Sequence, residues 1–259
     1  MKKAKFPIEA TALGMILFSK NMQEAMITGI LVIFSAVFAD TIKQILKNKI
    51  PEWSETICLL LLTGSICASA FTLSYAVLGW EQDTALWILH LILGLLCARY
   101  VLWKGSEKNI SLIQTATIWC FWILFAALRE FLSFGTIFDI VTIKTSYQST
   151  QFQKVVFGFL VAGLATAFTN TIFKTRQPKK ASIDKETFYV LIPAVCFSNP
   201  LHFSFLNNWI GTVLGIAVTL LFFVSIQKKI AFSRPGKAYQ GLPTELLSMG
   251  FLYMILALY

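Results

Sequence analysis

The sequence predicts an all-α fold, a polytopic membrane helical bundle of about nine transmembrane helices. Three observations support this prediction. Only 14% of the 259 residues are charged, against about 25% in an ordinary soluble domain. Hydrophobic residues make up 56%, and the mean hydropathy of +0.69 leaves too little polar surface for a water-soluble globule. The apolar residues are gathered in runs of about 20, the length of helix that crosses a bilayer.

The same composition excludes several classes of protein. A soluble enzyme, a disordered chain and a secreted disulfide scaffold would each need a different balance of residues. None of the five cysteines forms a CxxC pair, which argues against a structural zinc site or a disulfide framework. The net charge of +9 falls between the apolar runs, so it indicates membrane orientation and not nucleic-acid binding.

Nine apolar stretches account for most of the chain, and each predicts a helix because backbone groups in lipid must pair within their own segment. Glu9 interrupts the short first stretch, so we expect a short or broken helix there. No A-x-A-like site follows it, which argues against a cleaved signal peptide. Pro193 and Pro200 predict a break in the seventh stretch. The stretches are residues 6–19, 24–43, 55–79, 85–103, 110–134, 153–173, 188–206, 208–227 and 240–259.

Loop charges predict the orientation of these helices. Every second connection is basic, whereas the intervening ones are short or weakly charged, as at Glu81 and Asp83. The positive-inside rule then places the N-terminus in the cytoplasm and the C-terminus outside, with the first stretch counted as a crossing. The basic connections contain Lys2, Lys3 and Lys5; Lys43, Lys47 and Lys49; Arg99, Lys104 and Lys108; Lys174, Arg176, Lys179, Lys180 and Lys185; and Lys228, Lys229, Arg234 and Lys237.

Two passages of the sequence resemble each other. The fifth stretch, QTATIWCFWILFAALREFLSFGTIFD, and the eighth, NWIGTVLGIAVTLLFFVSIQKKIAFSRPG, are apolar helices that end in a charged doublet and a glycine-bearing turn. The doublets are Arg129 with Glu130 and Lys228 with Lys229. Loop charges put them at opposite faces of the membrane, which is typical of inverted repeats.

Three segments carry a resemblance to a known family. ALREFLSFGTIFD, which contains Arg129, Glu130 and Gly135, resembles the I-R-E-I-L-G-x-G-T-L-F pattern of the Rnf/Nqr membrane subunits. YQGLPTELLSMGFLYMILAL is similar to that family's F-R-G-L-P ending, and the segment from LGMILFSKN onward follows its N-terminal outline. The resemblance implies a subunit of an ion-translocating electron transport complex in the bacterial inner membrane, with other Rnf/Nqr-type subunits as partners.

The chain is longer than the family pattern. Family subunits usually have six helices in two inverted three-helix halves, so the resemblance implies one such unit followed by an extra C-terminal half-unit. We expect residues 1–150 to hold the first five helices and residues 151–259 to hold the rest, including that half-unit. Each unit would cross the membrane three times, so its chain would leave on the opposite side from where it entered. Successive units would therefore have opposite orientations.

The family resemblance also implies a 2Fe–2S cluster shared with an inverted partner subunit, each giving one cysteine from its first and one from its fourth helix. Ile16 stands where the first family cysteine would be. Cys97 and Cys196 lie close to the second family position, so they are the candidate cluster and metal ligands. The alternative is that all five cysteines are small packing residues in apolar helices.

Other polar side chains are candidates for an ion pathway. Arg129, Glu130 and Gly135 belong to the family motif, although the doublet could equally reach the interface and satisfy terminal carbonyls. Asp40 could coordinate an ion, or could pair with Lys43 three residues later. His90 is a candidate proton site because a membrane histidine usually faces protein or a water-filled cavity, whereas His202, next to Pro200, is expected to be an interfacial residue.

No P-loop, GxGxxG or HExxH motif is present, so the chain alone is not expected to oxidise NADH or hydrolyse a nucleotide, and no catalytic residue is assigned. Two functions therefore stay open. One is a subunit of an Rnf/Nqr-like complex that couples electron transport to sodium or proton movement. The other is a stand-alone transporter or accessory membrane protein that shares the repeat architecture and has no redox chemistry.

Overall fold

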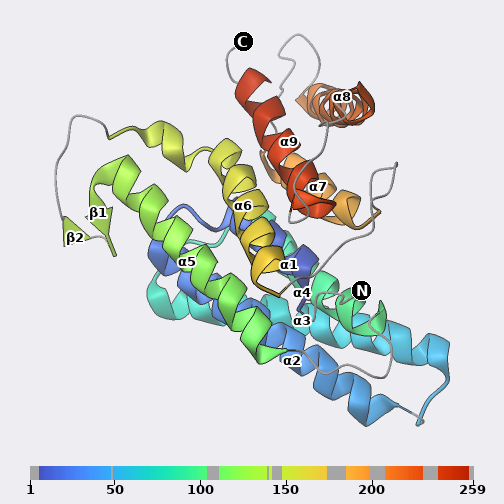
Figure 1. Ribbon diagram of the computed structural model, residues 1–259. Coiled ribbons are helices and arrows are strands. Elements are labelled where there is room, and N and C mark those ends of the chain that lie inside the picture. The colour runs from blue at the N-terminus through green and yellow to red at the C-terminus, as the bar shows by residue number, and fades with distance from the viewer. Residues whose placement is uncertain are drawn as a thin grey trace.

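A computed structural model describes residues 6–47, 49–103, 111–138, 140–141, 148–173, 185–198, 208–229 and 239–256. These residues form nine α-helices, one 3-10 helix and a two-stranded antiparallel ribbon (Figure 1). The helices are α1 (Ile8–Leu17), α2 (Met22–Leu46), α3 (Glu52–Leu78), α4 (Thr84–Trp103), α5 (Leu112–Phe134), α6 (Val155–Phe173), α7 (Lys185–Ser198), α8 (Asn208–Lys229) and α9 (Leu242–Leu256). The ribbon pairs β1 (Thr136–Ile137) with β2 (Ile140–Val141), and the 3-10 helix η1 is Thr150–Gln153.

Six of the described helices, α2 to α6 and α8, are long and apolar enough to cross a membrane. The all-α membrane bundle predicted from the sequence is confirmed at this level. The other three, α1, α7 and α9, are shorter apolar helices of 10, 14 and 15 residues. At 1.5 Å per residue α1 extends only about 15 Å, or roughly half of a hydrocarbon core.

The shortest helix is the most enclosed. Every residue from Ile8 to Ile16 is buried, and α1 packs against α4, α6 and α7 inside the bundle (Figure 1). Two glycines permit this close packing. A Cβ atom at Gly14 would meet the Trp122 ring of α5, and a Cβ atom at Gly158 of α6 would meet the backbone carbonyl of Ile16. A single apolar helix is thus surrounded by its own chain and not by lipid.

Pairs of contacts give the relative directions of neighbouring helices. Helix α1 runs parallel to α5, because Gly14 lies near Trp122 and Ser19 binds Arg129 further along both helices. It runs antiparallel to α4, since Glu9 binds Arg99 whereas Phe18 stacks near His90. Helices α6 and α9 are also antiparallel, as Gly163 faces Leu247 and Gly250 faces Leu160.

One hydrophobic core crosses the expected boundary at residue 150. Its buried members range from Phe6 to Tyr253, so residues 1–150 and 151–259 share their interior. A smaller cluster joins the far ends of α2, α3 and α4 around Ala39, Leu59 and Ala98. The outer faces are also apolar, which suits contact with lipid, and α8 lies at the periphery beside α7 and α9 (Figure 1).

The helix in the seventh predicted stretch differs from the one that the sequence predicts. The break predicted at Pro193 is wrong, because α7 continues through this proline to Ser198. Proline removes only one backbone donor, the partner of the Tyr189 carbonyl, and packing against α1 and α9 compensates for that loss. Pro200 lies outside the described residues.

Candidate functional site

The candidate site is the break between α1 and α2, at residues 18–21, and the polar groups that surround α1. At the break, the carbonyl end of α1 is buried at Phe18 and Ser19, whereas Lys20 is exposed and the N–H end of α2 is half-buried. Such ends carry unpaired backbone groups and opposite partial charges. The Ser19 hydroxyl is buried and donates to the Met15 carbonyl, which satisfies one of the free acceptors of α1.

Arg129 of α5 connects this break to the segment that precedes α6. Its guanidinium is only 2% exposed and donates through Nη1 to the Ser19 hydroxyl. Nε donates to the Phe152 carbonyl at 3.0 Å, and Nη2 donates to the carbonyls of Gln153 at 3.1 Å and Lys154 at 3.2 Å. One side chain therefore joins the end of α1 to the start of α6.

Glu130 binds the other side of the break, at the start of α2. Its carboxylate accepts a 2.8 Å hydrogen bond from the backbone N–H of Met22, the first residue of α2. The doublet thus places a cation at the carbonyl end of α1 and an anion at the N–H end of α2, which is the stabilising arrangement for both helix dipoles. Both side chains are buried within the protein, and Arg129 satisfies backbone carbonyls as the structural alternative proposes. Glu24 lies within electrostatic reach of Arg129 and Lys20.

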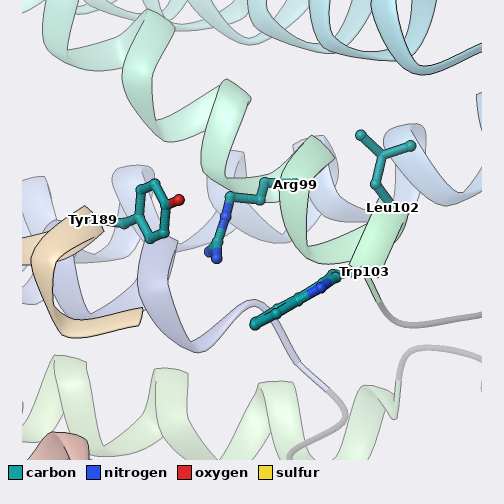
Figure 2. Close-up of a pocket in the computed structure, with 4 residues that line it drawn as sticks. All are labelled: Arg99, Leu102, Trp103 and Tyr189. Carbon is teal, nitrogen blue, oxygen red and sulfur yellow. The ribbon is translucent and has the colours of Figure 1, made fainter. Parts of the chain in front are cut away.

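The opposite end of α1 carries an ion pair. Glu9 accepts from Nη1 of Arg99, and the two side chains are 7% and 23% exposed. The Arg99 guanidinium also lies 3.7 Å from the Tyr189 ring centroid of α7 and 5.0 Å from the Trp103 ring centroid. Figure 2 shows the guanidinium between these two rings. A buried carboxylate is costly unless it is paired, so this contact fixes the position of α1 relative to α4 and α7.

His90 lies in an aromatic cluster at the C-terminal end of α1, beside the break. Its ring stacks on Phe71 at 4.1 Å and on Phe18 at 5.5 Å between centroids, with Tyr75 edge-on at 5.1 Å. Nδ1 is 3.2 Å from the side-chain nitrogen of Gln82. Nε2 is buried and has no hydrogen-bond partner among the described residues. The imidazole is therefore enclosed by rings from α3 and the end of α1, and no carboxylate of the described residues contacts it.

The cysteines do not fit the cluster that the resemblance implies. Cys97 is fully buried among α2, α3 and α4, where its thiol lies 3.8 Å from the Val32 carbonyl, and Cys67 is its buried neighbour. Cys196 is exposed on α7. Ile16, at the first family position, is also buried. Because its own helices enclose Cys97, this thiol does not face a space that it could share with Cys196 or a partner subunit. Among the described residues, no three His, Cys, Asp or Glu side chains form a metal-binding group.

The remaining predicted residues lie apart from the break or at its margin. Asp40 accepts from the Gln44 amide at 3.3 Å, and Lys43 donates to the Val101 carbonyl at 2.7 Å, so the predicted pair of Asp40 with Lys43 is wrong. Lys43 finds better acceptors in the free carbonyls at the end of α4. Gly135 ends α5 with a positive φ of 69°, a conformation that glycine adopts without strain. His202 lies outside the described residues.

Sequence reasoning missed the partner of Glu9 and the role of Glu245. Glu9 was visible as an acid inside an apolar stretch, a feature that usually marks a paired group in membrane helices. Arg99 was visible only as a basic residue near a helix end. Glu245, in the first turn of α9, is buried and accepts from the Thr187 hydroxyl of α7. Neither pairing could be found from spacing, because the partners are far apart in the chain.

These observations define an α-helical integral membrane protein with a buried short helix that is held by charged groups at both ends. No protein-family model, curated protein or solved structure matches the chain.

Proposed function

We propose that this protein is a membrane subunit of an Rnf/Nqr-like complex that couples electron transport to sodium or proton movement across a bacterial inner membrane. The observation that carries the proposal is the pair of hydrogen bonds by which Arg129 and Glu130 bind the two sides of the break between α1 and α2. These two residues are the charged part of the ALREFLSFGTIFD segment that resembles the family. The helix before this break, α1, is unusually short and packs inside the bundle, and unusually short membrane helices often mark the binding site in proteins that move ions.

The topology that we propose has nine membrane passages in three inverted units of three. The parallel course of α1 and α5 and the antiparallel course of α1 and α4 support it, because alternation requires both. The short helices α1 and α7 contact each other inside the bundle, as corresponding first helices of different units would be expected to do. The N-terminus is then cytoplasmic and the C-terminus outside.

Within such a complex, we assign this chain a structural or ion-conducting role and not that of an electron carrier. Cys97 is enclosed, Cys196 is exposed elsewhere, and Ile16 replaces the first family cysteine. The polar groups around α1 are the available elements of an ion path. Glu24, Arg129 and His90 lie at the C-terminal end of α1, and Glu9 with Arg99 lies at its N-terminal end.

The second candidate is a stand-alone transporter or accessory membrane protein. The packing at Ile16 favours it, since the carbonyl of this residue contacts Gly158 so closely that the site has become part of the apolar core. In that case the charged groups at both ends of α1 would serve transport or stability without any redox partner.

Purification of the tagged chain from its native membrane separates the two candidates. We expect flavin-binding and iron–sulfur subunits to copurify in a mild detergent, and no iron or EPR signal to belong to this chain alone. Loss of those partners in an Arg129→Gln variant that still inserts, with retention in Leu128→Ala, would tie the assembly to the break. Recovery of the chain alone in every mild detergent would favour the stand-alone protein.

A further inference from the structure

A cavity of about 320 Å³ opens between the end of α4 and the start of α7. It is lined by Arg99, Leu102, Trp103 and Tyr189 (Figure 2). The aromatic rings are largely exposed, at 68% for Trp103 and 45% for Tyr189. Exposed tryptophan and tyrosine at the end of an apolar helix are typical of the boundary between hydrocarbon and headgroups. The cavity therefore lies at headgroup level, and Leu102 gives it an apolar wall.

Arg99 has donors left for a ligand. Glu9 holds the guanidinium through Nη1, and the described residues make no hydrogen bond to Nε or Nη2. Those two N–H groups form the fork with which arginine binds two oxygens of one phosphate group. Because Glu9 fixes the guanidinium and the two rings flank it, little side-chain entropy would be lost when a ligand binds.

Charged side chains of both signs surround the cavity. Glu9 pairs with Arg99, and Glu186 lies within electrostatic reach of Glu9, so two carboxylates offset the described cations Arg99 and Lys43. Lys43 covers the carbonyls of Val101 and Leu102, which removes the partial negative charge at the end of α4 that would repel an anion. These conditions suit a singly charged phosphodiester that is recognised by hydrogen bonds.

We propose that this cavity binds the phosphodiester group of a glycerophospholipid. Nε and Nη2 of Arg99 donate to the phosphate oxygens, Trp103 and Tyr189 flank the glycerol region, and the acyl chains follow the apolar surface beside Leu102. Recognition depends on the phosphate and not on net headgroup charge. Phosphatidylglycerol and phosphatidylethanolamine are therefore both ligands, and diacylglycerol is not.

Native mass spectrometry of the full chain in detergent, with each of these three lipids added at equal concentration, tests the site. We expect retention of both phospholipids and none of diacylglycerol. Arg99→Lys keeps the charge beside Glu9 but loses the fork, and retention should fall about tenfold, as for the loss of one charge-assisted hydrogen bond. Trp103→Leu should also weaken retention.

Trp53→Leu is the matched control, because Trp53 is 71% exposed at the start of α3 and does not line the cavity. This variant should retain both phospholipids as the unaltered protein does. Equal retention of diacylglycerol, or an equal loss in Trp53→Leu, would show only general lipid contact and overturn the proposal. Displacement of the phospholipid by millimolar glycerol phosphate would identify a soluble phosphate ligand instead, and would also overturn it.

Discussion

Arg129 of α5 donates a hydrogen bond to the hydroxyl of Ser19, a residue that lies 110 positions earlier in the chain, inside the break that separates α1 from α2. The same guanidinium binds three backbone carbonyls at the end of η1 and just before α6. A buried cation is favourable here because it meets the carbonyl end of α1 and because its donors are used. The position of the short helix thus depends on a side chain from the fifth.

Replacement of Arg129 by glutamine should destabilise the protein. Each buried acceptor left without a donor costs about 1–3 kcal/mol, so we expect a fall of several degrees in the midpoint of thermal unfolding in detergent. Leu128→Ala is the control, because the neighbouring residue Leu128 is 51% exposed on the surface of α5. An unchanged midpoint in Arg129→Gln would show that the hydrogen bonds at the break do not contribute to stability.

Gly158→Ala should separate α1 from α6. The new Cβ atom would meet the Ile16 carbonyl, a backbone group that cannot rotate away, so we expect a loss of about 1–3 kcal/mol. Gly64→Ala is the matched variant, because its Cβ atom would lie 3.3 Å from the flexible end of the Leu95 side chain and should be tolerated. Thermal unfolding of the two variants measures the difference, and equal midpoints would contradict it.

The pair of Glu9 and Arg99 should show strong coupling. Arg99→Gln leaves a buried carboxylate unpaired and should cost about 3–5 kcal/mol. Glu9→Gln should cost less, because the remaining guanidinium is 23% exposed and can reach water. The double variant Glu9→Gln, Arg99→Gln should be more stable than Arg99→Gln alone. Additive losses in this double-mutant cycle would mean that the two side chains act independently.

Thiol reactivity should separate four of the five cysteines into two groups. Cys120 and Cys196 are exposed, so they should react rapidly with a lipid-soluble maleimide in detergent. Cys67 and Cys97 are buried in the core and should react only after unfolding. Mass spectrometry of the labelled peptides measures both rates. Rapid labelling of Cys97 in the folded protein would show that it faces an open space, and would revive its candidacy as a cluster ligand.

The proposed topology predicts opposite locations for the two termini. A reporter that is active only in the cytoplasm should work when fused to the N-terminus, and one that is active only outside should work at the C-terminus. A C-terminal fusion at Lys229, after α8, should report the cytoplasm and serves as an internal control. Both termini on the same side would exclude nine passages.

The hydropathy of the sequence was enough to place the helices. The predicted stretch 24–43 corresponds to the helix Met22–Leu46, and the predicted stretch 85–103 corresponds to the helix Thr84–Trp103. The agreement has a physical reason, because a helix in lipid extends until polar residues can reach water. The resemblance to the family also singled out Arg129 and Glu130, and both lie at the break. Spacing did not reveal what they bind, because their partners lie in the turn after α1, at the start of α2 and just before α6.

Only the tertiary structure decided which apolar helix lies inside. In lipid both the inner and the outer faces of a helix are apolar, so the periodicity that marks the buried face of a soluble helix is weak. Small residues at Gly14 and Gly158 and charges at Glu9 and Arg129 place α1 in the centre, and each acts through a partner distant in the chain. Local composition determines that a segment is helical and membrane-embedded, whereas packing and buried charge determine where it lies.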